Sequence, residues 1–104
     1  MKRWLMDLLK CPAEDCEGPL DLAVFDSHTM RVNDDDVEEI DEALITCGGC
    51  GRWYPVIDRI TCMLPDDMRL DEKQRKWEVA FLERWKERIP EEILEKGIPF
   101  GISQ

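Results

Sequence analysis

The sequence has few of the residues on which most catalytic sites depend. Its only histidine, His28, stands in a polar stretch, which predicts a surface side chain rather than a ligand or a general base. The sequence has no nucleophile elbow, phosphate-binding glycine loop or dinucleotide fingerprint. A length of 104 residues suits one domain and leaves no room for a nucleotide-binding α/β domain as well. We therefore expect a protein that is not an enzyme and depends on a partner for any methyl, phosphoryl or hydride transfer.

Basic residues are also scarce. The chain has 14 Lys and Arg residues against 24 Asp and Glu residues, which gives a net charge of −10. Sequence-independent affinity for nucleic acid comes from Lys and Arg side chains that neutralise phosphates. Direct tight binding of RNA or DNA is therefore not expected, whereas an acidic surface remains compatible with a basic protein partner.

Long hydrophobic runs are absent. The first ten residues, MKRWLMDLLK, lack the apolar core and cleavage site of a secretory signal, and no stretch reaches transmembrane length. We therefore expect a cytoplasmic protein without membrane attachment. Paired thiols in the reducing cytoplasm are more often metal ligands than disulfides, and the odd count of five cysteines agrees with that.

Four of the cysteines have the spacing of a metal site. Cys11 and Cys16 form a C-x4-C pair, Cys47 and Cys50 form a C-x2-C pair, and 30 residues separate the two pairs. Short turns of this kind bring both sulfurs of a pair to one ion, and four thiolates suit structural zinc with no position left for a reactive water. We predict one structural zinc ion. Cys62 has no paired neighbour and is predicted to be a small buried side chain.

Hydrophobic spacing predicts a mixed first half. A short helix is expected at about residues 3–10, with Leu5, Leu8 and Leu9 on its inner side. Alternation in LDLAVF predicts a strand from residue 20. Residues 26–45 are predicted to be a helical insertion, because Val37, Ile40 and Leu44 recur at helical intervals and Asn33 suits an N-cap. The segments LITC and RWYPVID, on either side of the second cysteine pair, predict a hairpin.

Residues 70–97 are predicted to form C-terminal helices. Asp71 suits an N-cap, and four residues at intervals of four predict a buried face: Trp77, Phe81, Trp85 and Ile89. Pro90 ends this helix and begins the next at its first position, Gly97 is expected to be a left-handed C-cap, and the tail from residue 98 is expected to be unstructured. The fold class is therefore α+β: residues 1–104 form one small zinc-ribbon sheet domain with a helical insertion and flanking helices.

The motifs LLKCP with Cys16, LITCGGCGRWYPVIDRI and CMLP resemble the small zinc-binding activator subunit shared by tRNA, rRNA and release-factor methyltransferases. The resemblance covers residues 1–16 and 44–65, and the insertion is similar to that of archaeal and eukaryotic members. Arg59 and Cys62 depart from the family pattern, in which glycine and proline are common at these positions. The resemblance implies a non-catalytic subunit that forms a heterodimer with an S-adenosylmethionine-dependent methyltransferase, stabilises it and helps it hold its methyl donor.

The stretch RWYPVIDRITCMLP has more apolar side chains than a small ribbon can cover, which favours contact with a partner strand. Packing within the ribbon's own core is an equal alternative for each of these side chains. The candidate partner-binding residues are Trp53, Tyr54, Ile60, Met63 and Leu64.

Two other functions stay open at this point. CGGCGRWYP resembles the knuckle of rubredoxin-like iron electron-transfer proteins, although those usually have two C-x2-C pairs. A nucleic-acid-binding zinc ribbon is the other alternative, which the acidic charge disfavours. A colourless protein that contains zinc would exclude the iron electron-transfer function, and failure to bind RNA would exclude the nucleic-acid-binding zinc ribbon.

Overall fold

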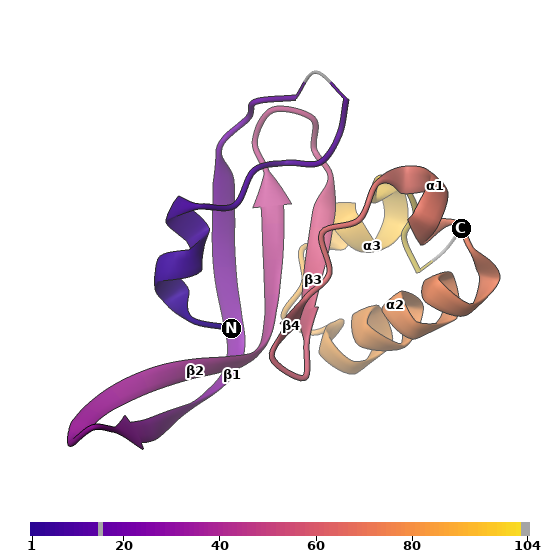
Figure 1. Cartoon of the computed structure of the whole chain (residues 1–104). Coiled ribbons are helices and arrows are strands. Elements are labelled where there is room, and N and C mark those ends of the chain that lie inside the picture. The colour runs from indigo at the N-terminus through magenta and orange to yellow at the C-terminus, as the bar shows by residue number, and fades with distance from the viewer. Residues whose placement is uncertain (15, 103–104) are drawn as a thin grey trace.

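A computed structural model describes residues 1–14 and 16–102, which form a four-stranded antiparallel sheet with helices on both faces (Figure 1). The strands lie side by side in chain order, β1-β2-β3-β4. None of the helices in the described ranges has the length and apolar character needed to cross a membrane. The elements are the 3₁₀ helix η1 (Arg3–Asp7), β1 (Leu20–Val32), β2 (Asp35–Cys47), β3 (Trp53–Ile57), β4 (Ile60–Thr61), α1 (Asp66–Arg69), α2 (Glu72–Trp85) and α3 (Glu91–Lys96).

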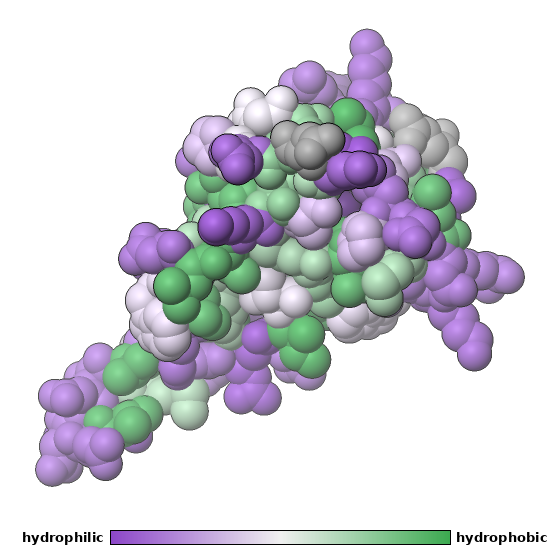
Figure 2. Space-filling view, turned by 45° about the horizontal axis from the view of Figure 1, so that its top comes forward, coloured by the Kyte–Doolittle hydropathy of each residue, from purple (hydrophilic) through white to green (hydrophobic). Residues whose placement is uncertain are grey.

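The predicted helical insertion is wrong, because residues 26–45 belong to the long hairpin of β1 and β2. The outer part of this hairpin, residues 26–40, is called the arm, and it projects from the body with mostly hydrophilic side chains (Figures 1 and 2). Its register runs from Ser27 opposite Ile40 to Val32 opposite Asp35. A shift in register between Val24 and Ser27 separates the arm from the inner part of the hairpin.

The turn at the arm tip explains why a hairpin forms here. Asn33 and Asp34 have φ values of 51° and 68°, so both central residues are left-handed, as in the two-residue turns that suit the twist of paired strands. Asparagine and aspartate tolerate this conformation better than other non-glycine residues. Asn33 therefore forms the turn rather than capping a helix.

The sheet buries a separate apolar cluster on each face. Strand alternation places Ala43, Ile45 and Tyr54 in the cluster that η1 covers, and Leu44 and Trp53 in the cluster under α2 and α3. Residues paired across β2 and β3 lie on the same face, as Ile45 opposite Tyr54 does. Both faces of β3 are therefore covered by the chain itself.

The first helix is shorter than predicted. It spans Arg3–Asp7, and Leu8, which was expected on its inner side, is 68% exposed. Leu5 and Leu9 pack against the cluster on that face of the sheet.

The C-terminal helices occur where the sequence predicts them, with corrections in detail. The Asp71 side chain caps α2 by accepting a hydrogen bond from the Gln74 N–H, and Phe81 and Ile89 are buried, but Trp77 is exposed. Pro90 is the N-cap of α3 rather than its first residue.

The segment after α3 is ordered rather than unstructured through residue 102. Phe100 is buried, and its carbonyl accepts a hydrogen bond of 2.8 Å from Trp53 Nε1. Gly97 has a φ of −58°, so its role is not a left-handed cap. A Cβ atom at Gly97 would lie 2.5 Å from the Ile93 carbonyl oxygen and 2.9 Å from Trp53 Nε1, so glycine is needed for close packing.

Glu39 ties the start of the chain to the arm. Its carboxylate accepts a hydrogen bond from the Met1 amino group at 2.8 Å and pairs with Lys2. The Lys2 hydrogen bond, followed by that of the Met1 amino group, lowers the pKa of Glu39 from 4.5 to about 2. The arm is therefore anchored at its base by a partly buried carboxylate.

We expect Glu39→Gln to lower the free energy of unfolding at pH 7 by about 1–3 kcal/mol, because charge-assisted hydrogen bonds are lost. As the pH falls, the Glu39 carboxylate takes up a proton in the unfolded chain before it does so in the folded chain. The stability that Glu39 contributes is therefore complete above about pH 4.5 and disappears as the pH falls toward 2. Urea unfolding of both proteins across this range should show a difference that shrinks with acid. Glu38→Gln is the control, because Glu38 and its partner Arg3 are exposed. An equal loss from both variants would contradict the anchoring role of Glu39.

Candidate metal centre

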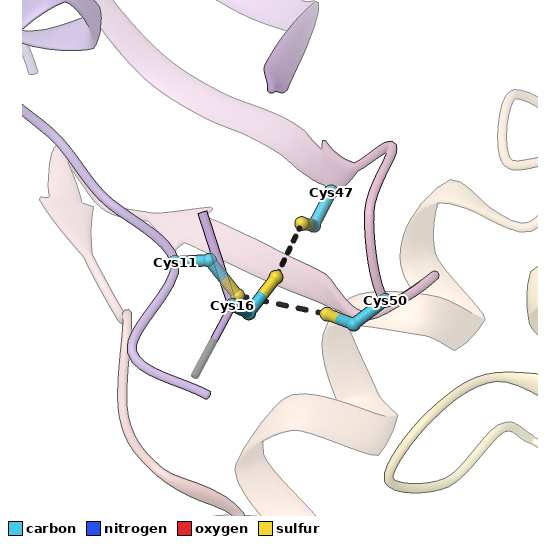
Figure 3. Close-up of side chains that lie close together, drawn as sticks. All are labelled: Cys11, Cys16, Cys47 and Cys50. Carbon is cyan, nitrogen blue, oxygen red and sulfur yellow. Dashed lines mark hydrogen bonds between the residues drawn. The ribbon is translucent and has the colours of Figure 1, made fainter. Parts of the chain in front are cut away.

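Four cysteine sulfurs converge between two loops at one end of the sheet (Figure 3). Cys11 and Cys16 lie in the loop between η1 and β1, Cys47 ends β2, and Cys50 lies in the turn before β3. The four Sγ atoms all lie within 4.8 Å of one another, with 3.6 Å between Cys11 and Cys50 and 3.5 Å between Cys16 and Cys47. These are the four cysteines whose spacing predicts a metal site.

The sulfur separations suit a tetrahedral ion. Four ligands at the Zn–S distance of about 2.3 Å would lie about 3.8 Å apart. This is close to the 3.6 Å between Cys11 and Cys50 and the 3.5 Å between Cys16 and Cys47. All four cysteines are free thiols rather than disulfides. Four sulfur donors at this spacing fit a structural zinc site, in which every coordination position is taken by the protein.

Two glycines allow the loops to meet. A Cβ atom at Gly18 would lie 2.5 Å from the Gly49 Cα atom and 2.9 Å from the Cys47 sulfur, and one at Gly49 would lie 2.8 Å from the Gly18 Cα atom. Such distances are impossible for real side chains, so the two backbones touch only because both residues are glycine. The sequence has three glycines in and after the second loop, at positions 48, 49 and 51, but nothing in it indicates the close contact with Gly18.

The second loop is closed by backbone hydrogen bonds. The Gly51 N–H donates to the Cys47 carbonyl at 3.0 Å, and the Cys47 N–H donates to the Arg52 carbonyl at 2.9 Å. Gly51 has a φ of 77°, a conformation that favours glycine. The Gly48 N–H donates to the Pro19 carbonyl at 2.8 Å and joins the two loops.

The cluster contains thiols of unequal acidity. Burial acts to raise the pKa of Cys50, but the Arg52 backbone N–H and guanidinium outweigh it and lower the pKa to about 6. The Gly18 N–H acts to lower the pKa of Cys16, whereas the Cys47 thiol and burial raise it to about 12. Arg52 is held in position by Asp66, whose two carboxylate oxygens accept hydrogen bonds at 2.9 and 2.6 Å. A cation that binds here must displace the remaining thiol protons.

Two of the five candidate partner-binding residues are buried in the structure. Trp53 and Tyr54 are fully buried within the chain, on opposite faces of β3, because both faces of this strand are covered. The Tyr54 hydroxyl lies 3.1 Å from the Cys11 sulfur. Ile60 is 58% exposed, and Met63 and Leu64 are partly exposed, so these three side chains remain accessible.

The two other residues singled out in the sequence lie apart from the sulfurs. Cys62 is buried and is not one of the four clustered cysteines, as predicted. Burial is the main reason that its pKa is raised to about 11. His28 is exposed on the arm, with 44% of its side chain accessible, and its Nδ1 atom lies 2.7 Å from an Asp41 carboxylate oxygen.

Comparison with known proteins gives one match. The family model described as Trm112p-like protein matches residues 2–58, which include all four clustered cysteines and strands β1 to β3. No curated protein and no solved structure matches the chain. The helices α1, α2 and α3 lie beyond the matched residues.

We expect serine at any one of the four clustered cysteines to lower the bound metal and the thermal stability, since metal affinity in small sites of this kind is folding free energy of about 10 kcal/mol. Metal content by plasma emission spectrometry and thermal unfolding check this. Cys62→Ser is the control and should keep one zinc ion per chain. Equal zinc loss from Cys62→Ser would overturn the ligand assignment, and a coloured iron protein would favour the rubredoxin-like alternative.

We expect Gly18→Ala to lower both stability and zinc affinity, because its methyl group would overlap the Gly49 backbone. Overpacking of this kind costs about 1–3 kcal/mol. Gly48→Ala is the matched control, because its Cβ atom would meet only the Pro19 ring, at 3.1 Å, and backbone no closer than 3.6 Å. Chelator competition and urea unfolding should separate the two variants, and equal effects would contradict the proposed role of the Gly18 and Gly49 contact.

Proposed function

The chain belongs to the Trm112p-like family, and from this we propose that it is a non-catalytic zinc-binding subunit that binds and stabilises S-adenosylmethionine-dependent methyltransferases. Their substrates would be tRNA, rRNA or a translation release factor, and the complex would be a cytoplasmic heterodimer. The observation that carries the proposal is the four-sulfur cluster within the residues that the family model matches.

The donor set supports a structural role for the metal. Zinc bound by four thiolates would cross-link the two loops, and it would have no open coordination position for substrate or water. Cys11 and Cys16 would hold it from the first loop, and Cys47 and Cys50 from the second. The chain itself would bind no S-adenosylmethionine, so the methyl transfer belongs to the partner.

Three accessible apolar residues in and beside β4 are the partner surface that we propose. Ile60 lies in β4, which has two residues and is the last strand of the sheet, and Met63 and Leu64 follow it in the chain. An edge strand presents unpaired backbone groups to a neighbouring chain, and accessible apolar side chains beside it add contact area. We assign partner contact to these three residues and not to the buried Trp53 and Tyr54.

Affinity purification of the tagged protein from its native cell tests the proposal. We expect methyltransferases among the co-purifying chains, and repeated preparations without any would contradict the proposed function.

The isolated subunit should bind no S-adenosylmethionine in calorimetry, because its sequence has no fingerprint for such a cofactor. Adding it should raise the melting temperature and activity of the methyltransferase, because it binds the folded partner only.

Charged substitutions should separate partner binding from metal binding. We expect Ile60→Asp or Met63→Asp to abolish the stabilisation of the methyltransferase while the zinc content stays at that of the wild type, because an unpaired charge in an apolar contact is costly. Val32→Asp is the matched control, since Val32 is also exposed, at 43%, but lies at the arm tip. Full activation by both charged variants, or equal loss from Val32→Asp, would count against the proposed surface.

A further inference from the structure

The phenol of Tyr54 reaches the metal centre from the core of the sheet. Tyr54 is fully buried, and its hydroxyl lies 3.1 Å from the sulfur of Cys11, which is also buried. A buried hydroxyl without a hydrogen-bond partner would lower stability substantially. Tyr54 is therefore not an ordinary core side chain, since its polar atom points at one of the four clustered sulfurs.

We propose that Tyr54 is a positioning residue of the metal centre and that its hydroxyl donates a hydrogen bond to the Cys11 thiolate. The buried pair of Arg69 and Glu78 holds the tyrosine in place. The direction of the hydrogen bond follows from the chemistry of the two groups. A metal-bound thiolate has no proton and can only accept, so the hydroxyl is the donor. A hydrogen bond of this kind removes negative charge from the sulfur and fixes its orientation.

Arg69 connects this tyrosine to the helical layer. Its guanidinium carbon lies 5.1 Å from the centre of the Tyr54 ring and 4.5 Å from that of Trp53. Arg69 also donates to the Trp53 carbonyl at 2.6 Å and to the Glu78 carboxylate at 2.8 Å. Arg69 and Glu78 are both fully buried and form an ion pair, in which each charge compensates the other. Because a buried charge without its partner is costly, the pair restricts both side chains to one position.

The connection spans two parts of the chain. Cys11 and Tyr54 lie within the residues that the family model matches, whereas Arg69 in α1 and Glu78 in α2 lie beyond them. A cation above an aromatic ring is attracted to its face, which resists rotation of the ring away from the sulfur. The inference rests on the metal site of the proposed function and is independent of the methyltransferase partner.

Tyr54→Phe tests the inference because it removes only the hydroxyl. Loss of an outer hydrogen bond to a ligand typically lowers metal affinity about 10- to 100-fold, so zinc transfer to a chelator should be faster by a comparable factor. In the cobalt-substituted protein, the sulfur-to-cobalt charge-transfer band should move to longer wavelength, because the Cys11 sulfur becomes a better electron donor. In the zinc protein, Tyr54→Phe should also increase the alkylation rate of Cys11 more than that of Cys47, as measured by mass spectrometry.

Val56→Ala is the matched control. Val56 is fully buried on the same strand and in the same apolar cluster as Tyr54. Its truncation therefore lowers stability without removing a hydrogen bond to a sulfur, because valine has no polar side-chain atom. The control should leave the cobalt band in place. A wild-type cobalt spectrum and zinc release rate for Tyr54→Phe, or the same band shift for Val56→Ala, would overturn the inference. The expected band shift for Tyr54→Phe, together with failure of the wild-type protein to bind any methyltransferase, would instead count against the proposed function alone.

Discussion

The meeting of two cysteine loops at one point is the constraint on which the rest of the structure depends. The sulfurs converge only because Gly18 and Gly49 let the two backbones touch, and because β2 and β3 hold the second loop in register. Tyr54 then links this point to the buried pair of Arg69 and Glu78, so the cysteine loops are connected to the helices across the sheet. A small domain gains stability from such a connection, since its apolar core alone is modest.

The clustering of the four cysteines and the class of fold could be predicted from the sequence because their signals are local. The spacing of Cys11, Cys16, Cys47 and Cys50 is short within each pair, and a turn of two to four residues restricts where both sulfurs can point. The helix that begins after Asp71 was likewise predicted from a cap followed by residues at intervals of four. Burial of Cys62 followed from its apolar surroundings.

The remaining features depend on contacts between distant residues. The helical spacing of Val37, Ile40 and Leu44 competed with strand alternation, and pairing with β1 decided the outcome together with the left-handed turn at Asn33 and Asp34. Trp53 and Tyr54 are buried within the chain, because apolar clusters cover both faces of β3, which a pattern along one strand does not reveal. The buried pair of Arg69 and Glu78 looks in sequence like two ordinary surface charges.

X-ray absorption at the metal edge of the zinc-loaded protein tests the central claim most directly, because it counts and identifies the atoms bound to the ion. The account predicts four sulfur scatterers at about 2.3 Å and no oxygen or nitrogen ligand. A site with fewer than four sulfurs, or with a bound water in place of one of them, would contradict the closed structural centre on which the proposed non-catalytic role depends.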